Sequence, residues 1–323
     1  MTRKLFSNPL IFGVVISLIL VAAVGKIKAA EKIKFGTPVK LSPVLYLPVL
    51  AGEERGFWKK NNVSVEWLPF RGGSALYRGI AANSVEMGVS STGSHMRAAG
   101  RGVPVVIVAE SNRSQDFIVW VRADSRFKNP RDLKGARIGV PRLGGSSHGF
   151  GLVIVKALGL EKDVKFLGMG GIRPEPAALK TGGIDAIIEP ISIPAELKVM
   201  GVVRELVSTS DYLPKEWMSN AVFARRDFLK AKPKMVSGVV KAFIEAARFI
   251  TGNEAWSIEK MKQMSHYSEE AARLVYKQLN FTRDGKIRKK ALENVLNFYI
   301  KQGIISKESA PSLETLYTME FTR

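Results

Sequence analysis

Two successive segments of the chain repeat the same order of apolar and polar positions. Each begins with an apolar stretch that carries one basic residue and ends in Gly-x-Pro, at 33–38 and at 136–141. A glycine follows twenty residues after the glycine of that stretch, and then come an alternating stretch, a Gly-Gly pair and an acid before an apolar run. This order predicts strand, helix, strand, turn, helix and strand in each half, which is the alternation of a parallel sheet covered by helices.

Turn glycines alone do not establish a duplication, because any two βαβ units share them. The equal spacing and the repeated Gly-x-Pro are what favour one. The matched positions are Gly36 with Gly56 in the first half, and Gly139 with Gly159 in the second. We therefore expect an α/β fold built from two duplicated halves.

The chain beyond about residue 218 shows the apolar spacing of helices. Within 235–250 the apolar residues recur at intervals of three and four, and the stretches 268–279 and 287–300 are similar. Helices of this kind bury one face, so we expect them to cover a core.

Two extended segments flank the second half and suggest how the halves are joined. These segments, 116–121 and 220–224, are what a two-stranded hinge between lobes would need. The first lobe would then hold 31–120 and 218–323, and the second lobe 121–217. Each is long enough to bury its own core.

An apolar run of sixteen residues, from Leu10 to Gly25, follows two basic residues near the start of the chain. The run is shorter than the ~20 residues that a spanning helix needs, and a basic start before such a run is typical of an export signal. We expect residues 1–30 to be this signal, cleaved after Gly25 or after Ala30, which places the mature protein in the periplasm. An uncleaved membrane anchor is the alternative.

The amino-acid composition excludes several kinds of binding or catalytic site. The chain has no cysteine, which excludes disulfides, a lipid-anchored cysteine, a thiolate nucleophile and Cys-ligated zinc. The three histidines lie far apart without metal-ligand spacing, so no metal or cofactor is expected. The formal net charge of +20 suggests nucleic acid, but the basic residues are scattered, and we interpret the charge as a solvated surface. We expect no nucleic-acid partner.

Ligands of open parallel sheets bind beyond the carboxyl ends of the strands. The loops at these ends hold 33 residues, of which nine are Ser or Thr, where the composition of the chain predicts between three and four. Four are basic and one is acidic, so an anionic ligand is somewhat favoured. The candidate ligand-binding residues are Lys40, Ser42, Tyr46, Arg71, Ser90, Ser91, Thr92, Arg142, Gly145, Ser146, Ser147, His148, Arg173 and Glu189.

Each candidate also has a purely structural explanation. A serine at a helix start is as often a cap as a ligand. If the halves oppose each other, Ser146 and Ser147 should face the loop 90–94. Lys40 and Arg142 occupy nearly equivalent places in the two halves and would clamp an anion from both sides, although surface ion pairs are the commoner role of such residues.

The remaining candidates are aromatic or histidine side chains. His148 is placed to donate a hydrogen bond to a ligand, whereas His95 fits a helix face better. Tyr46 and Trp217 would stack on a planar ligand, although most such aromatics fill a core. No Ser-His-acid set and no Walker or dinucleotide glycine pattern is present in the sequence, so we expect no catalytic residue.

Four stretches carry a resemblance to a known family through their order and spacing rather than through any one motif. They are 51–58, 72–88, 132–140 and 177–186. In them the chain resembles the substrate-binding proteins of nitrate, sulfonate, taurine and bicarbonate ABC importers, a family that includes thiamine-pyrimidine binders.

The resemblance implies a bilobed periplasmic-binding-protein fold of the second type, with two crossovers between the lobes. It implies ligand contacts at 41–46, 90–94 and 144–148, and a membrane permease driven by a separate ATPase as the partner of a monomeric protein. The yeast-type pyrimidine synthases of this fold rely on cysteines, which this chain lacks.

The leading hypothesis is therefore a solute-binding protein that closes about a hinge on a small ligand. One alternative is the receptor of a secondary, TRAP-like transporter or a membrane sensor. Another is an enzyme of the same fold, such as the menaquinone-pathway lyases. A small oxyanion or sulfonate, a carboxylate and a neutral heteroaromatic all remain compatible with the loops.

Overall fold

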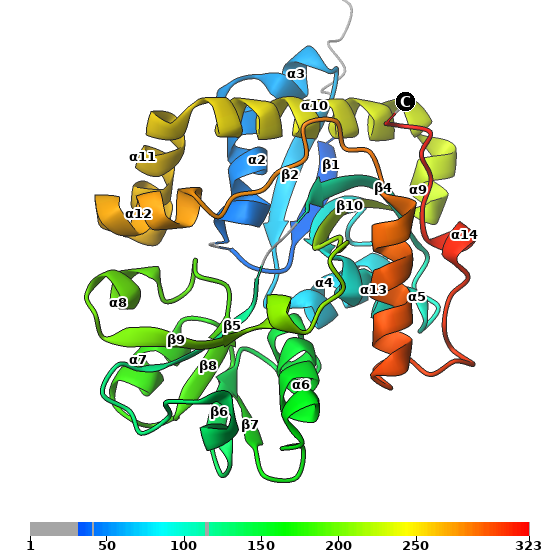
Figure 1. Ribbon diagram of the computed structural model, residues 1–323. Coiled ribbons are helices and arrows are strands. Elements are labelled where there is room, and N and C mark those ends of the chain that lie inside the picture. Colours follow the sequence, from blue (N-terminus) through cyan, green and yellow to red (C-terminus); the bar gives the residue numbers. More distant parts are fainter. Residues whose placement is uncertain (1–31, 41, 114–115, 323) are drawn as a thin grey trace, which may run out of the picture. The chain divides into compact units, whose positions relative to one another are not determined.

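A computed structural model of the protein describes residues 32–40, 42–113 and 116–322 (Figure 1). The expected export signal at 1–30 lies outside these residues. Among the helices that are described, none is long and apolar enough to cross a membrane.

Two five-stranded sheets form the frame of the protein (Figure 1). The first has the order β2 (Ser64–Pro69), β1 (Lys32–Thr37), β3 (Met87–Ser91), β10 (Asn220–Arg225) and β4 (Val105–Asn112). The second has the order β7 (Lys165–Gly168), β6 (Arg137–Val140), β8 (Ala186–Glu189), β5 (Ile118–Arg122) and β9 (Val203–Ser208).

The two sheets share one topology. In each, the first three strands are parallel and the fourth runs antiparallel to both of its neighbours. The α/β prediction with two mixed, mostly parallel sheets is confirmed, and the matching strand order is what a duplication would produce.

The repeated glycine has the same backbone conformation in both halves. Gly56 has φ 70° and Gly159 has φ 72°, a left-handed conformation that glycine adopts without a steric penalty. Gly159 caps the end of the first helix of the second half, and Gly56 lies two residues after the last residue of the first helix of the first half. The equal spacing in the sequence therefore marks where each first helix must stop.

Helices connect and cover the strands. In the two halves they are α2 (Pro43–Glu54), α3 (Phe57–Lys60), α4 (Gly73–Ala81), α5 (Thr92–Ala99), α6 (Ser146–Leu158), α7 (Pro174–Lys180) and α8 (Ala195–Val199), with 3-10 turns at Pro130–Leu133 and Thr209–Asp211. The last third supplies α9 (Arg226–Ala231), α10 (Pro233–Gly252), α11 (Glu254–Ser265), α12 (Glu269–Tyr276), α13 (Lys289–Lys301) and α14 (Leu313–Leu316).

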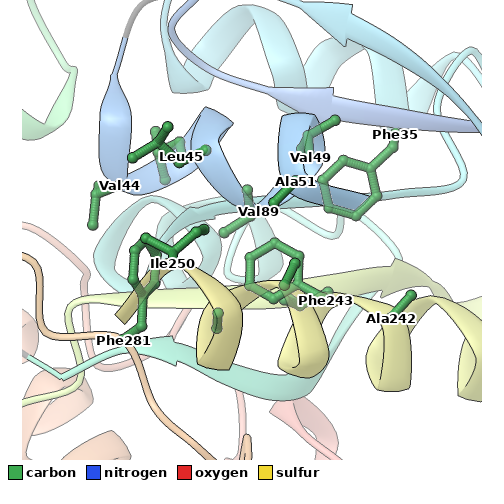
Figure 2. Packing of buried hydrophobic residues seen from close by; sticks show 14 of the residues in the cluster. Phe35, Val44, Leu45, Val49, Ala51, Val89, Ala242, Phe243, Ile250 and Phe281 are labelled. Carbon is green, nitrogen blue, oxygen red and sulfur yellow. The ribbon is translucent and has the colours of Figure 1, made fainter. Parts of the chain in front are cut away.

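The stripe predicted within 235–250 lies on α10 and packs with α2 against the first sheet (Figure 2). Phe243 and Ile250 of α10 meet Leu45 and Val49 of α2 and Phe35 of β1, and all five side chains are buried. Burial of one such side chain stabilises the fold by ~1.5–3 kcal/mol. This core therefore packs α2 and α10 against the first sheet.

The segments expected to form the hinge are strands of two different sheets and do not pair with each other. β5 pairs with β8 and β9, whereas β10 pairs with β3 and β4. The chain passes between the sheets just before β5 and again between β9 and β10. An extended sequence pattern identifies a strand but not the sheet that the strand joins. This is why the sequence suggested that the two segments act together, whereas each belongs to a different sheet.

Backbone hydrogen bonds tie these two passages together. The amide of Ser219 donates to the carbonyl of Asn112 at 3.2 Å, and the amide of Thr209 donates to the carbonyl of Phe117 at 2.8 Å. An ion pair supports the first passage, because Arg288 Nη2 lies 2.6 Å from an oxygen of Glu110, whose side chain is fully buried, while the side chain of Arg288 is 32% exposed.

Aromatic residues fill the space beside the passages. Phe117 stacks on Phe150 with ring centroids 4.5 Å apart, and Trp217 contacts Phe150 and the edge of Phe298. Trp217 is buried in this cluster, so it fills a core rather than stacking on a ligand. The cluster includes residues of both sheets, which makes the lobes continuous here.

Candidate functional site

Two connected cavities lie at the carboxyl ends of the parallel strands of both sheets. We call the inner one, of about 100 Å³, the serine pocket; its hydroxyl lining is Ser42, Ser90, Ser91, Ser94, Ser146 and Ser147. We call the outer one, of about 450 Å³, the basic mouth; its charged lining is Lys40, Arg71, Arg142 and Arg173. Both cavities are lined by Pro38, Val39, Gly72, Pro141, Arg142 and Ile172.

A cluster of hydroxyls joins the two halves inside the serine pocket. Ser146 Oγ lies 2.9 Å from Ser91 Oγ and 3.1 Å from Ser94 Oγ, and Ser91 donates to Ser94 at 2.9 Å. Ser91 caps α5, and Ser146 is the first residue of α6. Two helix N-termini therefore converge on one cluster, and their free amide groups favour negative charge there.

A half-buried cation lies beside this cluster. Arg97 Nη2 donates to Ser94 Oγ at 2.9 Å, and the guanidinium lies 5.4 Å from the ring centre of Tyr299. Arg97 Nη1 is buried without a hydrogen-bond partner among the described residues. The positive charge of Arg97 therefore acts on the hydroxyl cluster, and no carboxylate among the described residues forms an ion pair with it.

Glu189 contributes a carboxyl group to the lining of the serine pocket. Ser147 Oγ donates to Glu189 Oε1 at 2.5 Å, while the indole of Trp120 donates to the Glu189 carbonyl at 2.8 Å and fixes the end of β8. Glu175, in the first turn of α7, is fully buried. Burial raises the pKa of both carboxyls, and the nearby Glu189 raises the pKa of Glu175 further.

The four basic residues of the mouth are exposed, and none forms an ion pair with a described residue. Arg142 reaches over Gly72 of the first half, where a Cβ would lie 3.4 Å from the Arg142 Cδ. Gly72 has φ 99°, so a side chain there would also strain the backbone. Elsewhere arginines pair closely, as Arg137 does with Asp185 at 2.9 Å.

Eleven of the fourteen candidates line the two cavities. The serine pocket takes Ser42, Ser90, Ser91, Arg142, Gly145, Ser146, Ser147 and Glu189, and the basic mouth adds Lys40, Arg71 and Arg173. Ser146 faces the loop 90–94 as expected from opposed halves, whereas Ser147 turns to Glu189 instead.

The other three candidates lie outside the linings. Tyr46 stacks on Trp67 with ring centroids 3.9 Å apart, and Thr92 is buried beneath the pocket. His148 Nδ1 accepts a hydrogen bond from the amide of Gly144 at 3.0 Å, which turns the ring into its own loop. Its pKa is lowered by burial and by Arg97.

Three functional candidates were absent from the residues chosen on sequence: Ser94, Arg97 and Glu175. Ser94 belongs to the loop 90–94 that the sequence did single out. Arg97 lies one helical turn after Ser94, so the i, i+3 spacing places both on one face of α5. Glu175 carries no signal beyond its position two residues after Arg173.

A separate cavity of about 310 Å³ has the opposite character. Its lining includes Asp116 and Glu205 and no basic residue among those described. Burial raises the pKa of Asp116, and the charges of Asp211 and Glu205 add to this rise. Such a lining repels an anion. The described residues also hold no group of three or more His, Cys, Asp or Glu that could bind a metal ion.

A family model described as NMT1/THI5 like matches residues 45–255. A protein of Brucella abortus (strain 2308) that is assigned as a binding protein is 28% identical over 212 residues, or 64% of this chain and 63% of that one. The chain therefore spans less than two thirds of that relative. The taurine-binding periplasmic protein of Escherichia coli (strain K12) is 23% identical over 235 residues, covering 68% of this chain and 70% of that one.

Solved structures show the same fold. The alkanesulfonate-binding protein SsuA of Xanthomonas axonopodis pv. citri, bound to MOPS, superposes with a TM-score of 0.76 at 17% identity, over 90% of this chain and 100% of that one. The desulfurization enzyme DszB superposes with a TM-score of 0.63 at 15% identity, over 90% and 98%. The bilobed type II fold of periplasmic binding proteins is thus confirmed, and it is a fold that also hosts an enzyme.

Proposed function

The chain belongs to the NMT1/THI5-like family, and from that premise we propose that it is an extracytoplasmic solute-binding protein of an ABC importer that captures a small anion. The taurine-binding and alkanesulfonate-binding relatives support this proposal. The expected partner is a membrane permease, and the binding protein acts as a monomer.

One observation carries the proposal. Ser146 of one half is hydrogen-bonded to Ser91 and Ser94 of the other half, at the meeting point of two helix N-termini and beside Arg97. Hydroxyls and helix N-termini donate to an oxyanion without adding a full charge. A cluster of such donors from both halves suits a ligand that both halves must hold.

Closure about the two passages between the sheets is the proposed mechanism. We take 31–120 with 218–323 as the first lobe and 121–217 as the second. When the lobes separate, the hydroxyls of Ser91 and Ser146 part, and an anion that enters accepts hydrogen bonds from both. Because the anion contacts both lobes only in the closed state, its binding shifts the population toward closure, which the permease would recognise.

The same geometry favours binding over catalysis. The hydroxyls of Ser91, Ser94 and Ser146 are bonded to one another and to Arg97 rather than to a base, since His148 accepts from the Gly144 amide and lies outside the pocket lining. Ser147 is the pocket serine whose hydroxyl donates to a carboxyl, that of Glu189. A serine without a base is a weak nucleophile. The pocket is therefore better suited to hold a ligand than to react with it.

The proposal is tested by native mass spectrometry of the purified protein, followed by a thermal-shift screen of sulfonates, sulfate, phosphonates, carboxylates, neutral heteroaromatics and cations. We expect anions to raise the melting temperature, because a ligand that binds only the folded state stabilises it. Stabilisation by cations alone, or by neutral heteroaromatics alone, would contradict the proposal.

A further inference from the structure

Helix α8 lies between two strands of the second sheet in the sequence, yet it packs against α12, whose buried residues belong to the core of the first sheet. Ala195 of α8 is fully buried in that core, and Val199 packs against it. In return, Leu274 of α12 packs against the cluster of the second sheet that holds Trp120 and Ile187. Apolar side chains of the two halves therefore interlock at this place.

Hydrogen bonds cross the same boundary. The amide and the hydroxyl of Ser268 both donate to Glu196 Oε2, at 2.9 and 3.1 Å. The hydroxyl of Tyr267 donates to the carbonyl of Ser192. The turn before these donors passes through His266, whose φ of 55° is left-handed and uncommon for a residue other than glycine. This turn thus presents two consecutive residues of one half as donors to the other half.

Glu196 completes a helix cap that α12 does not complete by itself. Ser268 is the N-cap of α12, and its hydroxyl accepts from the amide of Ala271 at 3.2 Å. In a capping box the residue at this third helical position is Glu or Gln, and its side chain accepts from the amide of the N-cap. Alanine has no such group, and Glu196 of the other half accepts from the Ser268 amide in its place. If the halves part, this amide loses its acceptor and the positive end of α12 loses this carboxylate.

These contacts are separate from the ligand site. None of Glu196, Tyr267 and Ser268 lines the serine pocket or the basic mouth. A contact that exists only while the lobes are together, and that does not touch the ligand, favours the closed state whether or not a ligand is bound. Such a contact also changes the measured affinity, because the apparent dissociation constant is the intrinsic one divided by the fraction of protein that is closed.

We propose that Glu196, together with Tyr267, forms a latch between the lobes that sets the closed fraction of the ligand-free protein and thereby the affinity for every ligand alike. The effect on affinity rests on the proposed function, in which the lobes close on the ligand. The effect on the ligand-free protein rests on the contacts between α8 and α12.

The lack of cysteine in the chain makes the latch measurable, because two introduced cysteines are then the only sites for spin labels. Lys59→Cys in the first lobe and Lys162→Cys in the second are at exposed positions. Double electron-electron resonance of the ligand-free protein then reports the open and closed populations. In Glu196→Ala we expect the ratio of closed to open protein to fall about tenfold, because an acceptor of two charge-assisted hydrogen bonds is lost. By titration calorimetry, the affinities for all anions that bind should fall by one common factor.

Matched variants separate the latch from a general loss of stability. Glu196→Gln keeps an acceptor for the Ser268 amide and should retain most of the closed population. Tyr267→Phe removes one hydroxyl and should shift the populations in the same direction as Glu196→Ala but less, and it decides the question if Glu196→Ala does not fold. Glu161→Ala removes an exposed acid of the second lobe and should change neither the populations nor the affinities.

The outcomes also separate the latch from the proposed function. If the populations and the affinities stay unchanged in Glu196→Ala and Tyr267→Phe, or if the populations shift toward the closed state, the latch is wrong and anion binding stands. A loss of affinity that differs from one anion to the next also overturns the latch, because Glu196 would then act on the ligand itself. A protein that binds no compound of the screen contradicts the proposed function, while the ligand-free populations still decide whether the latch exists.

Discussion

The serine pocket and the basic mouth lie at the same strand ends and share part of their lining, yet they are built in different ways. In the pocket, polar groups are bonded to one another, as Ser146 is to Ser91 and Ser94. In the mouth, four positive side chains point into solvent without a bonded partner among the described residues.

This difference separates two tasks. Groups that are buried and already positioned interact strongly with a ligand, because water neither screens nor competes with them. Exposed charges are screened within ~8 Å at physiological ionic strength, so they attract a ligand but hold it weakly. We therefore expect the pocket to decide which anion stays bound and the mouth to decide how fast anions arrive.

The largest effect should come from the pocket. Replacing Ser91 and Ser146 together by alanine removes a donor from each half, and each hydrogen bond to a charged ligand contributes ~1.5–3 kcal/mol. We expect the affinity for the best anion of the screen to fall ~100-fold or more. Titration calorimetry measures this loss.

A matched serine pair serves as the control. Ser306 and Ser309 are exposed and their hydroxyls lie 3.0 Å apart, so their double alanine variant removes the same atoms away from the pocket. It should bind as the unmodified protein does. If the pocket variant also keeps its affinity, the hydroxyl cluster is only a pair of helix caps and the comparison fails.

The strand ends of this site could be predicted from the sequence because local rules govern them. The glycine spacing marks the end of the first helix of each half, which stops at Gly159 in the second half and two residues before Gly56 in the first, and parallel strands bring their carboxyl ends to one edge. Hence the loops that hold Ser91, Ser146 and Arg142 were correctly located next to one another.

Side-chain direction could not be predicted in the same way. Whether His148 turns toward a ligand or accepts from the Gly144 amide depends on the local turn, and Glu175 is buried by packing between elements distant in sequence. The sheet to which an extended segment belongs is equally non-local, which is why β5 and β10 were taken together as a hinge.

A smaller effect is expected at the boundary of the two cavities. Arg142 lines both and reaches over Gly72, so it is the cation of the mouth best placed to touch a bound anion. We expect Arg142→Gln to weaken binding about tenfold at low salt and less as salt is added, measured by calorimetry over a salt series.

Arg131 provides the control for this substitution, since it is exposed and lies outside both linings. Arg131→Gln removes the same charge and should leave the affinity unchanged. If Arg142→Gln loses as much affinity as the double serine variant, and the loss does not depend on salt, then Arg142 holds the bound anion as the pocket serines do. The division between the serine pocket and the basic mouth would then be wrong at this residue.

The smallest effect should come from the mouth itself. Arg173 lines only the outer cavity and is exposed, so its charge acts through solvent. We expect Arg173→Gln to slow association about two- to threefold at low salt while dissociation stays constant, because a rim charge steers the approach of a ligand without holding it. Stopped-flow binding at several salt concentrations resolves the two rates. A faster dissociation that persists at high salt would mean that Arg173 contacts the bound anion, and the mouth would then be part of the binding site rather than its approach.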